Sequence, residues 1–407
     1  MNGDAPGKSI LLGIILFCLA ASCGMGPSEE KRAQLAGQAD GDIEIGIVRT
    51  SAYSNFFLEG VTLAVEEINA GGGLLGRKLH IIVHDDRNEA GRGEKAATAL
   101  ARKKEVVAVI GHGNSNTAIP ASVIYEKSGI LFISCWAKNP VMTLYGGNYT
   151  FRNIPSQKKF GVQMAEFVQS RGMKKTVVFH ERDAAQKSLA NSFKKRATAL
   201  GIEIKATRSY FGWEREFREV IAALLKVLER SKKKAEAWGK PEPGSKLNFD
   251  SIFISGTRPG AAELVKQLRE MGIGVPIVGG KGLDSPGFWA AAGKAAEGIV
   301  VPTVFNPGYP DKKTRDFVRR FKERYELIPD TWAAQGYDAV SVLAHIIQES
   351  GSTVPLVMST NLRYLEDWNG VTGSYSFTPR GDISGKEIFF KKRENGAFFF
   401  QTLLNRE

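Results

Sequence analysis

The chain has 407 residues, of which 43% are hydrophobic, and its 55 lysines and arginines exceed its 43 aspartates and glutamates, giving a formal net charge of +12. This composition excludes a disordered chain, and the length predicts two domains after the N-terminal segment. A basic chain would suit nucleic acid, but the runs at 232–234 and 391–393 lack regularly interleaved aromatic residues. We interpret them as solvated faces and expect no nucleic-acid partner.

The N-terminal segment resembles an export signal. The apolar run from Ile10 to Ser22 follows Lys8 and is too short to cross ~30 Å of hydrocarbon. It ends at Cys23, and Leu19 to Cys23 resembles the lipobox of bacterial lipoproteins, in which the cysteine is acylated and becomes the mature N-terminus. We predict a signal peptide with lipobox at 1–23, a flexible tether at 24–42 and a protein lipid-anchored to the membrane in the periplasm or cell envelope. The alternative is an ordinary signal peptide in which Cys23 is incidental.

The cysteines exclude an internal disulfide in the mature body. Cys18 would be cut away and Cys23 would carry lipid, which leaves Cys135 alone. A lone cysteine of this kind is predicted to be a small buried apolar residue and not a nucleophile.

From Ile43 the chain alternates strand and helix. We predict strands at 43–48 and 78–84, an amphipathic helix at 56–69 ended by Gly71 to Gly73, and a helix at 92–104 that leads into a strand at Val106. This succession predicts βαβ units on a parallel sheet.

Two consecutive strand-to-helix junctions are the most informative part of the chain. The apolar runs Val106 to Ile110 and Ile130 to Ile133 are each followed by a small polar loop and a helix start. Neighbouring parallel strands bring such loops to one sheet edge, where helix N–H groups and the hydroxyls of Ser115, Thr117 and Ser134 would hold a small polar ligand. This pattern favours binding over reaction.

A second succession of the same kind follows Phe151 to Pro155. Its predicted helices lie at 158–171, 187–200, 215–229 and 259–271, and its predicted strands at 176–179, 203–207, 251–255 and 276–279. A surface insertion is expected at 231–246, helices resume at 312–325 and 331–349, and the end of the chain is predicted as a β-hairpin turning at Glu394-Asn395-Gly396.

Motifs along the whole body resemble the Leu/Ile/Val-type, or branched-chain amino-acid, periplasmic binding proteins of ABC transporters. They are Ala64–Leu79, Asp85-Asp86, Val109-Ile110-Gly111 with Ser115, Ile133-Ser134, Asn139-Pro140, Phe151-Arg152, Ala295–Gly298 and Gly336–Val340. The resemblance implies the type I periplasmic binding protein fold, an α/β fold with two Rossmann-like lobes with parallel sheets, joined by three hinge crossovers near 151–155, 298–302 and 371–376. Lobe 1 would comprise 43–153 and 302–370, and lobe 2 would comprise 154–301 and 371–407.

The resemblance also implies a ligand cleft that closes by hinge motion. In lobe 1 it places Ser115, Asn116, Trp136, Ala137 and Lys138 around a ligand carboxylate, with Tyr53 as an aromatic wall. In lobe 2 it places Ala185, Thr257, Arg258 and Lys281 at the ligand. This chain departs from the amino-acid binders at Lys138, where they have threonine, at Ala185 and Thr257, where they have tyrosines, and at Lys281, where a glutamate holds the ligand ammonium.

These departures predict a ligand other than a free amino acid. A lysine facing an ammonium would remove a charge-assisted hydrogen bond of about 1.5–3 kcal/mol. We therefore expect a solute-binding lipoprotein that captures a small organic anion, such as an aromatic carboxylate or a dicarboxylate, and delivers it to an ABC importer permease. The alternatives are a sensing or regulatory envelope lipoprotein of the same fold, a binder of branched-chain amino acids or amides, and an arrangement in which Lys138 and Lys281 turn to solvent.

No enzyme signature is present in the sequence. Adjacent residues of His84-Asp85-Asp86 would point to opposite faces of a strand, and the glycines at 71–76 precede a strand instead of following one. His112 near Ser115 lacks a Gly-x-Ser-x-Gly elbow and an evident acid. We expect no enzyme, no cofactor and no metal.

Overall fold

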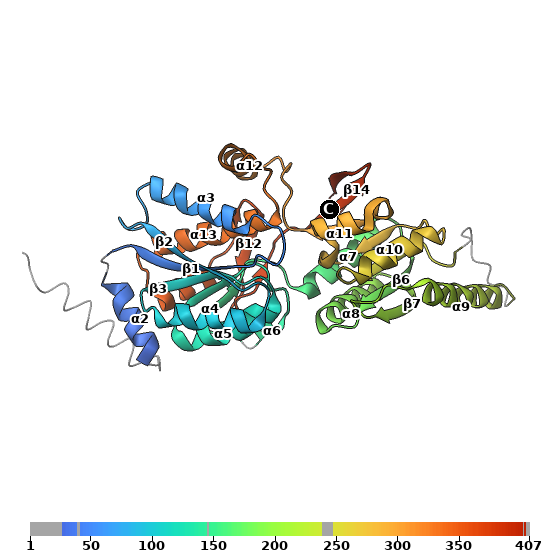
Figure 1. The fold of residues 1–407 in the computed structure, drawn as a ribbon, viewed down its shortest axis with the longest axis horizontal. Coiled ribbons are helices and arrows are strands. Elements are labelled where there is room, and N and C mark those ends of the chain that lie inside the picture. The colour runs from blue at the N-terminus through green and yellow to red at the C-terminus, as the bar shows by residue number, and fades with distance from the viewer. Residues whose placement is uncertain (1–26, 39–40, 145, 238–246, 402, 404–407) are drawn as a thin grey trace, which may run out of the picture. The chain divides into compact units, whose positions relative to one another are not determined.

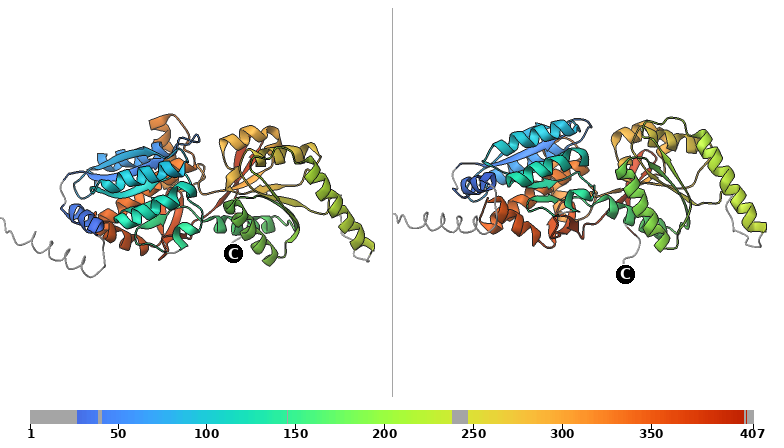
Figure 2. Two further views of the ribbon diagram at one scale, coloured as in Figure 1. Left: turned by 60° about the horizontal axis from the view of Figure 1, so that its bottom comes forward. Right: turned by 90° about the horizontal axis from the view of Figure 1, so that it is seen from below.

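The structure is a computed structural model that describes residues 27–38, 41–144, 146–237, 247–401 and 403. The chain divides into two compact units. Unit 1 comprises Met1–Pro155 and Pro307–Lys386, and unit 2 comprises Ser156–Asn306 and Glu387–Glu407. Each unit has its own sheet and helices (Figure 1, Figure 2). The predicted signal peptide and Cys23 lie outside the described residues.

The sheet of unit 1 is entirely parallel, as predicted, in the order β2-β1-β3-β4-β5. Its strands are β1 (Ile43–Arg49), β2 (Leu79–Asp85), β3 (Val106–Gly111), β4 (Leu131–Ser134) and β5 (Thr150–Arg152). Every residue of β3 and β4 is buried, which explains why these strands are continuous apolar runs.

Helices cover both faces of this sheet. The core on one face includes side chains of α3 (Phe57–Ala70) and α13 (Thr331–Ser350), and the core on the other includes those of α4 (Ala90–Arg102) and α5 (Ser115–Ser128) (Figure 1). Gly60 lets α3 approach α13 closely, because a Cβ at Gly60 would lie 2.0 Å from the carbonyl oxygen of Ala333. This contact places the first turn of α13 beside the start of α3.

The predicted tether is wrong for residues 27–37, which form helix α2 (Pro27–Gly37) packed on unit 1. Arg32 is fully buried, and its guanidinium donates to the carbonyl oxygens of Ala101 (2.9 Å), Lys103 (2.8 Å), Ser128 (3.0 Å) and Val106. These carbonyls lie at or near the ends of α4 and α5 and the start of β3. Helix C-termini leave carbonyl groups unsatisfied, and one arginine from α2 satisfies several of them.

The rest of unit 1 contains α6 (Val141–Leu144), α12 (Lys312–Tyr325), α14 (Pro355–Arg363) and the antiparallel strands β11 (Trp368–Gly370), β12 (Gly373–Phe377) and β13 (Ile383–Ser384). Residues 371–386 therefore belong to unit 1, and their assignment to the second lobe needs correction. The physical reason is packing, since Tyr375 and Phe377 are part of the unit 1 core and the Asp338 carboxylate accepts hydrogen bonds from the Val371 and Thr372 N–H groups.

The sheet of unit 2 has the order β15-β14-β10-β9-β8-β6-β7. Parallel pairing joins β6 (Lys175–Glu181), β7 (Glu203–Tyr210), β8 (Ser251–Ser255), β9 (Ile277–Gly279) and β10 (Val300–Thr303). The predicted hairpin is confirmed as β14 (Phe389–Glu394) and β15 (Ala397–Gln401), with Asn395 and Gly396 at φ angles of 51° and 76°. Positive φ at both turn positions explains the Asn-Gly sequence.

The helices of unit 2 are α7 (Gln157–Ser170), α8 (Ala184–Ala199), α9 (Arg218–Ala237), α10 (Gly260–Glu270) and α11 (Pro286–Ala292), with short 3₁₀ helices at Lys281–Leu283 and Gly293–Ala296. Helix α9 continues beyond Glu229 to Ala237, so the expected insertion at 231–246 begins as helix. Residues 238–246 lie outside the described residues. Across the described helices of both units, none combines the length and hydropathy that crossing a bilayer requires.

Candidate functional site

The two predicted junctions meet at the carboxyl edge of the unit 1 sheet. Gly111 at the end of β3 pairs with Val48 of β1 on one side and with Ser134 of β4 on the other. Because the three strands are parallel and in register at their ends, the loops that follow them emerge together. This edge carries Tyr53, Ser115 and Trp136.

An aromatic stack lies in these loops. The Trp136 ring packs against Tyr53 with centroids 6.2 Å apart and against Trp332 with centroids 4.2 Å apart and planes 24° apart. Phe57 closes the stack edge-on at 5.9 Å from Trp136. Trp332, in the first turn of α13, was not among the predicted site residues. The sequence offers only a tryptophan at a predicted helix start, and its position beside Trp136 requires the tertiary fold.

The indole nitrogen of Trp136 is a buried donor in need of an acceptor. Trp136 is 5% exposed, and its Nε1 atom has no hydrogen-bond partner among the described residues. A buried donor left unsatisfied costs about 1–3 kcal/mol. The described residues supply no acceptor for this donor.

Ser115 begins α5 and links the two loops, because its Oγ atom accepts a hydrogen bond of 3.2 Å from the Asn139 N–H. Its hydroxyl hydrogen can still be donated to a ligand. The expectation of several free helix N–H groups needs correction. The Asn114 side chain caps α5 by accepting from the N–H groups of Asn116 (2.7 Å) and Thr117 (3.0 Å), so these donors are already satisfied.

The loop after β4 is also held by its own hydroxyl. Ser134 Oγ accepts from the Ala137 N–H at 3.1 Å, and Ala137 is fully buried, so these two residues shape the loop. Lys138 places its Nζ atom 5.6 Å from the centroid of a Trp332 ring. A positive charge therefore lies against the aromatic stack as a cation–π contact.

Below the β3 loop lies a buried polar cluster of Asp86, His112 and Tyr125. His112 Nδ1 is 3.4 Å from Asp86 Oδ2 and His112 Nε2 is 2.9 Å from the Tyr125 hydroxyl, while Asp86 accepts from the Gly113 N–H at 2.8 Å. Burial lowers the pKa of His112. Burial raises the pKa of Asp86, but the adjacent His112 ring and the hydrogen bonds from the Gly113 and Asn88 N–H groups outweigh burial and hold that pKa below its usual range. The cluster supports the loop before Ser115.

Cys135 lies in the core of unit 1, which confirms the prediction of a buried apolar residue. Cys135 is fully buried, its Sγ lies 3.7 Å from the Gln335 carbonyl oxygen, and burial raises the pKa of its thiol. Within the described ranges, no group of histidine, cysteine, aspartate and glutamate side chains could hold a metal ion. Burial and the charge of Asp86 raise the pKa of Tyr53 to about 12, so this wall of the stack stays a neutral phenol.

In unit 2, the other predicted residues follow the carboxyl ends of β6, β8 and β9. Ala185 donates its N–H to the capping carboxylate of Asp183 at 2.7 Å, and Thr257 donates both its N–H (2.9 Å) and its hydroxyl (2.8 Å) to Glu181. Arg258 is exposed, and its guanidinium lies over Gly287 of α11. Thr257 and Arg258 therefore lie just beyond the carboxyl end of β8, at the edge of the unit 2 sheet.

The expected role of Lys281 needs correction. Its side chain is 3% exposed, and its Nζ atom lies 2.5 Å from the buried carboxylate of Asp284, which also binds Lys391 at 2.9 Å. Burial raises the pKa of Asp284, but the charges of Lys281 and Lys391 outweigh burial and hold it well below its usual range. The ammonium of Lys281 therefore compensates a carboxylate inside unit 2.

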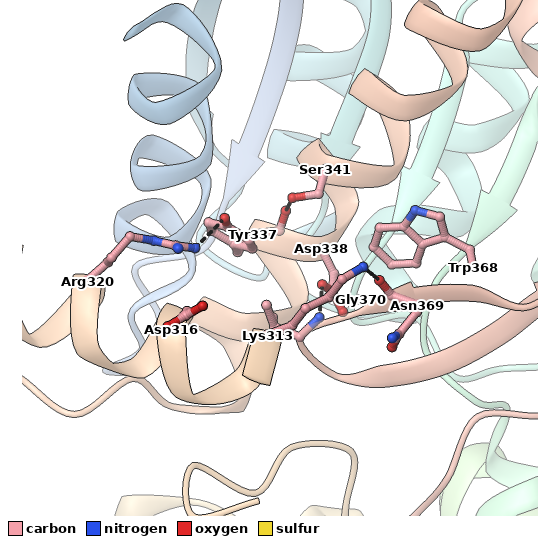
Figure 3. Close-up of a pocket in the computed structure, with 10 residues that line it drawn as sticks. Lys313, Asp316, Arg320, Tyr337, Asp338, Ser341, Trp368, Asn369 and Gly370 are labelled. Atoms are coloured by element: carbon pink, nitrogen blue, oxygen red, sulfur yellow. Dashed lines mark hydrogen bonds between the residues drawn. The ribbon is translucent and has the colours of Figure 1, made fainter. Parts of the chain in front are cut away.

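A cavity of about 340 Å³ lies elsewhere in unit 1, against α12, α13 and β11 (Figure 3). Its cations already bond protein groups, since Arg320 donates to the Tyr337 hydroxyl at 3.0 Å and Lys313 to the Asn369 carbonyl at 2.6 Å. None of the predicted site residues lines this cavity. We therefore place the candidate site at the strand ends.

Comparisons with known proteins support the α/β fold and identify the family. A sequence model of the periplasmic binding protein family matches residues 47–387. The chain is 27% identical to the Leu/Ile/Val-binding protein homolog 1 of Brucella abortus over 88% of this chain and 92% of that one.

Two solved structures extend the similarity. An ABC transporter substrate-binding protein from Desulfitobacterium hafniense, solved in complex with Leu, is 36% identical, has a TM-score of 0.75, and is matched over 88% of this chain and 100% of its own. The leucine-binding protein LivK from Thermotoga maritima is 26% identical with a TM-score of 0.74, over 89% and 99%. The chain belongs to the periplasmic binding protein family and is a solute-binding protein of the ABC-transporter type, not an enzyme.

Proposed function

We propose that this protein captures a small monocarboxylate with a flat or branched apolar body and delivers it to an ABC importer. The observation that carries this proposal is the stack of Tyr53, Trp136 and Trp332 beside Ser115, with a donor, Trp136 Nε1, that needs an oxygen. The carboxylate would accept from Ser115 Oγ and Trp136 Nε1, and the apolar body would pack on the rings. As the resemblance implies, we include Thr257 and Arg258 as further contacts of the captured solute.

The named ligands of the relatives support the same chemistry. The Desulfitobacterium hafniense structure holds Leu, and the Brucella relative is named for Leu, Ile and Val. All of these carry a carboxylate and a branched apolar body. A dicarboxylate receives less support, because the second cation expected to bind it, Lys281, is paired with Asp284.

A free amino acid is the second candidate. The leucine complex of the 36% identical relative favours it, and so does Glu181, whose carboxylate lies at the end of β6 beside Thr257. We favour a ligand without an ammonium, because Lys138 adds positive charge at the stack and because the carboxylate of Asp284 is occupied by two lysines.

A matched pair of solutes tests this choice. L-leucine and 4-methylpentanoate share an apolar body and a carboxylate and differ by the amino group. Calorimetric titration of protein freed of carried-over solute should give measurable binding of 4-methylpentanoate or benzoate, at least as tight as leucine. Saturable binding of leucine with no binding of either amine-free acid would reject the proposal in favour of the amino acid.

We also propose that the protein is held at the membrane by a lipid on Cys23. The lipobox resemblance at Leu19 to Cys23 supports this, and α2 begins at Pro27, so the folded body would start within about 14 Å of chain from the anchor. Mass spectrometry of the N-terminal peptide from cells should show acylated Cys23. Release of the native protein without detergent, with an unmodified N-terminal peptide, would contradict the anchor.

A further inference from the structure

A second polar cluster in unit 1 lies directly behind the candidate site. Lys386, Gln335 and Asn153 are almost completely buried, with exposed fractions of 2%, 0% and 0%. Lys386 Nζ donates to the Asn153 carbonyl oxygen at 2.9 Å and to Gln335 Oε1 at 2.8 Å. Gln335 Nε2 returns a bond of 3.2 Å to the same carbonyl, and Asn153 Nδ2 donates to the Gln335 carbonyl at 3.0 Å. The three side chains thus form one closed network.

The network touches the ligand loop at two places. The Asn153 N–H donates to the Ser134 carbonyl oxygen at 3.1 Å, and the Cys135 thiol lies 3.7 Å from the Gln335 carbonyl oxygen. Ser134 and Cys135 directly precede Trp136. Gln335 lies on α13 one helical turn beyond Trp332, the partner of Trp136 in the stack. A solute that moves Trp136 or Trp332 would therefore act on this network.

The same network holds two of the places where the chain leaves unit 1. The first segment of unit 1 ends at Pro155, two residues after Asn153, and the last segment ends at Lys386 itself. The Lys386–Asn153 bond therefore ties one crossover to another at their unit 1 ends. Gln335 bonds both crossovers to α13, so the unit 1 ends of the two crossovers are held in fixed positions.

Burying the Lys386 ammonium costs more free energy than burying a neutral donor in the same place. Its ammonium is removed from water and contacts two amide oxygens and the Tyr375 ring, whose centroid is 4.4 Å away. The buried carboxylate of Asp338 is the nearby opposite charge. Burial without a direct carboxylate contact costs free energy. A charge retained at such a cost is consistent with a positioning role.

We propose that Lys386, Gln335 and Asn153 are positioning residues that couple occupancy of the Trp136–Trp332 stack to the two crossovers, so that they set solute affinity without touching the solute. This inference rests on the proposed function for its affinity readout only. Loosening the cluster gives the crossovers more conformations, which must be reordered when a solute is held, and affinity falls.

The test compares Lys386→Met and Gln335→Met with a matched core variant, Val342→Ala, whose side chain is fully buried on α13 and is not a member of the cluster. The probes are benzoate and L-leucine, whichever binds the wild type, titrated well below the lowest melting temperature. We expect Kd to rise about tenfold in the two cluster variants and to stay within about twofold in Val342→Ala at a similar loss of stability.

Hydrogen exchange provides a readout that needs no solute. The amides of Asn153, Ile154 and Ser156 and those at 386–388 should exchange faster in Lys386→Met than in Val342→Ala. Equal exchange in the two variants, or a Kd that tracks melting temperature across all three, would overturn the inference. If neither probe binds the wild type, the proposed function fails, while the exchange comparison still decides the role of the cluster.

Discussion

Trp136 and Trp332 lie face to face, with ring centroids 4.2 Å apart and planes inclined by 24°. One ring follows strand β4 and the other opens helix α13, so the contact joins the ligand loop to the helix that carries Gln335. The stack forms the flat apolar surface of the candidate site. The buried Trp136 Nε1 donor in it has no hydrogen-bond acceptor among the described residues.

Replacing Trp332 with leucine should weaken benzoate binding by about 0.5–1.5 kcal/mol, up to roughly tenfold, because a ring stacked on the solute ring contributes about this much beyond its buried area. Titration calorimetry with benzoate measures the change. Trp213→Leu is the control, since Trp213 is 71% exposed in unit 2 and should leave Kd unchanged. Equal affinities in wild type and Trp332→Leu would remove this ring from the site.

Replacing Ser115 with alanine should cost about 1–2 kcal/mol of binding, because it removes the hydroxyl that is proposed to donate to the carboxylate and that accepts from the Asn139 N–H. The melting temperature should fall only slightly. Ser122→Ala is a suitable comparison on the same helix, because the Ser122 hydroxyl bonds only within α5, to the Ile119 carbonyl at 2.7 Å. A Ser115→Ala protein with wild-type Kd would exclude the hydroxyl as a ligand contact.

Replacing Lys281 with methionine should reduce stability by about 2–4 kcal/mol and leave solute affinity within about twofold, because the lysine neutralises buried Asp284. Urea unfolding and calorimetry measure the two effects. The double variant Lys281→Met with Asp284→Asn should recover part of the lost stability. A large loss of affinity without loss of stability would restore Lys281 as a ligand contact.

Replacing Arg32 with methionine should destabilise the protein by about 2–4 kcal/mol, since carbonyl groups at the ends of α4 and α5 lose their buried donor. Lys31→Met, next to it on the exposed side of α2, should have almost no effect. Thermal unfolding of both variants checks the docking of α2. Identical melting temperatures would mean that α2 does not stabilise unit 1.

The stability of the wild type should rise with pH in the range where Lys386 loses its proton. Burial lowers the pKa of Lys386 from 10.5 to about 8, while Asp338 and Cys135 raise it in part. The unfolded chain therefore binds more protons than the folded chain between about pH 8 and 10.5, and folding gains up to about 3 kcal/mol across that window.

Other groups titrate in the same range, so the measurement is the difference in unfolding free energy between wild type and Lys386→Met at pH 7.5 and at pH 9.5. That difference should grow in favour of the wild type as pH rises. A constant difference would show that Lys386 has the same pKa in the folded and unfolded chain.

The sequence by itself determined the α/β class, the parallel order of strands and the two junctions around Ser115 and Trp136, because apolar runs, helix caps and Gly-containing turns are local signals. Only the tertiary structure shows which residues the charged and aromatic side chains contact. Lys281 pairs with Asp284, and Arg32 bonds a helix to unit 1 where a tether was expected. Residues 371–386 pack in unit 1, and Trp332 stacks on Trp136. These outcomes depend on contacts between segments far apart in the chain, and periodicity and spacing carry no information about such contacts.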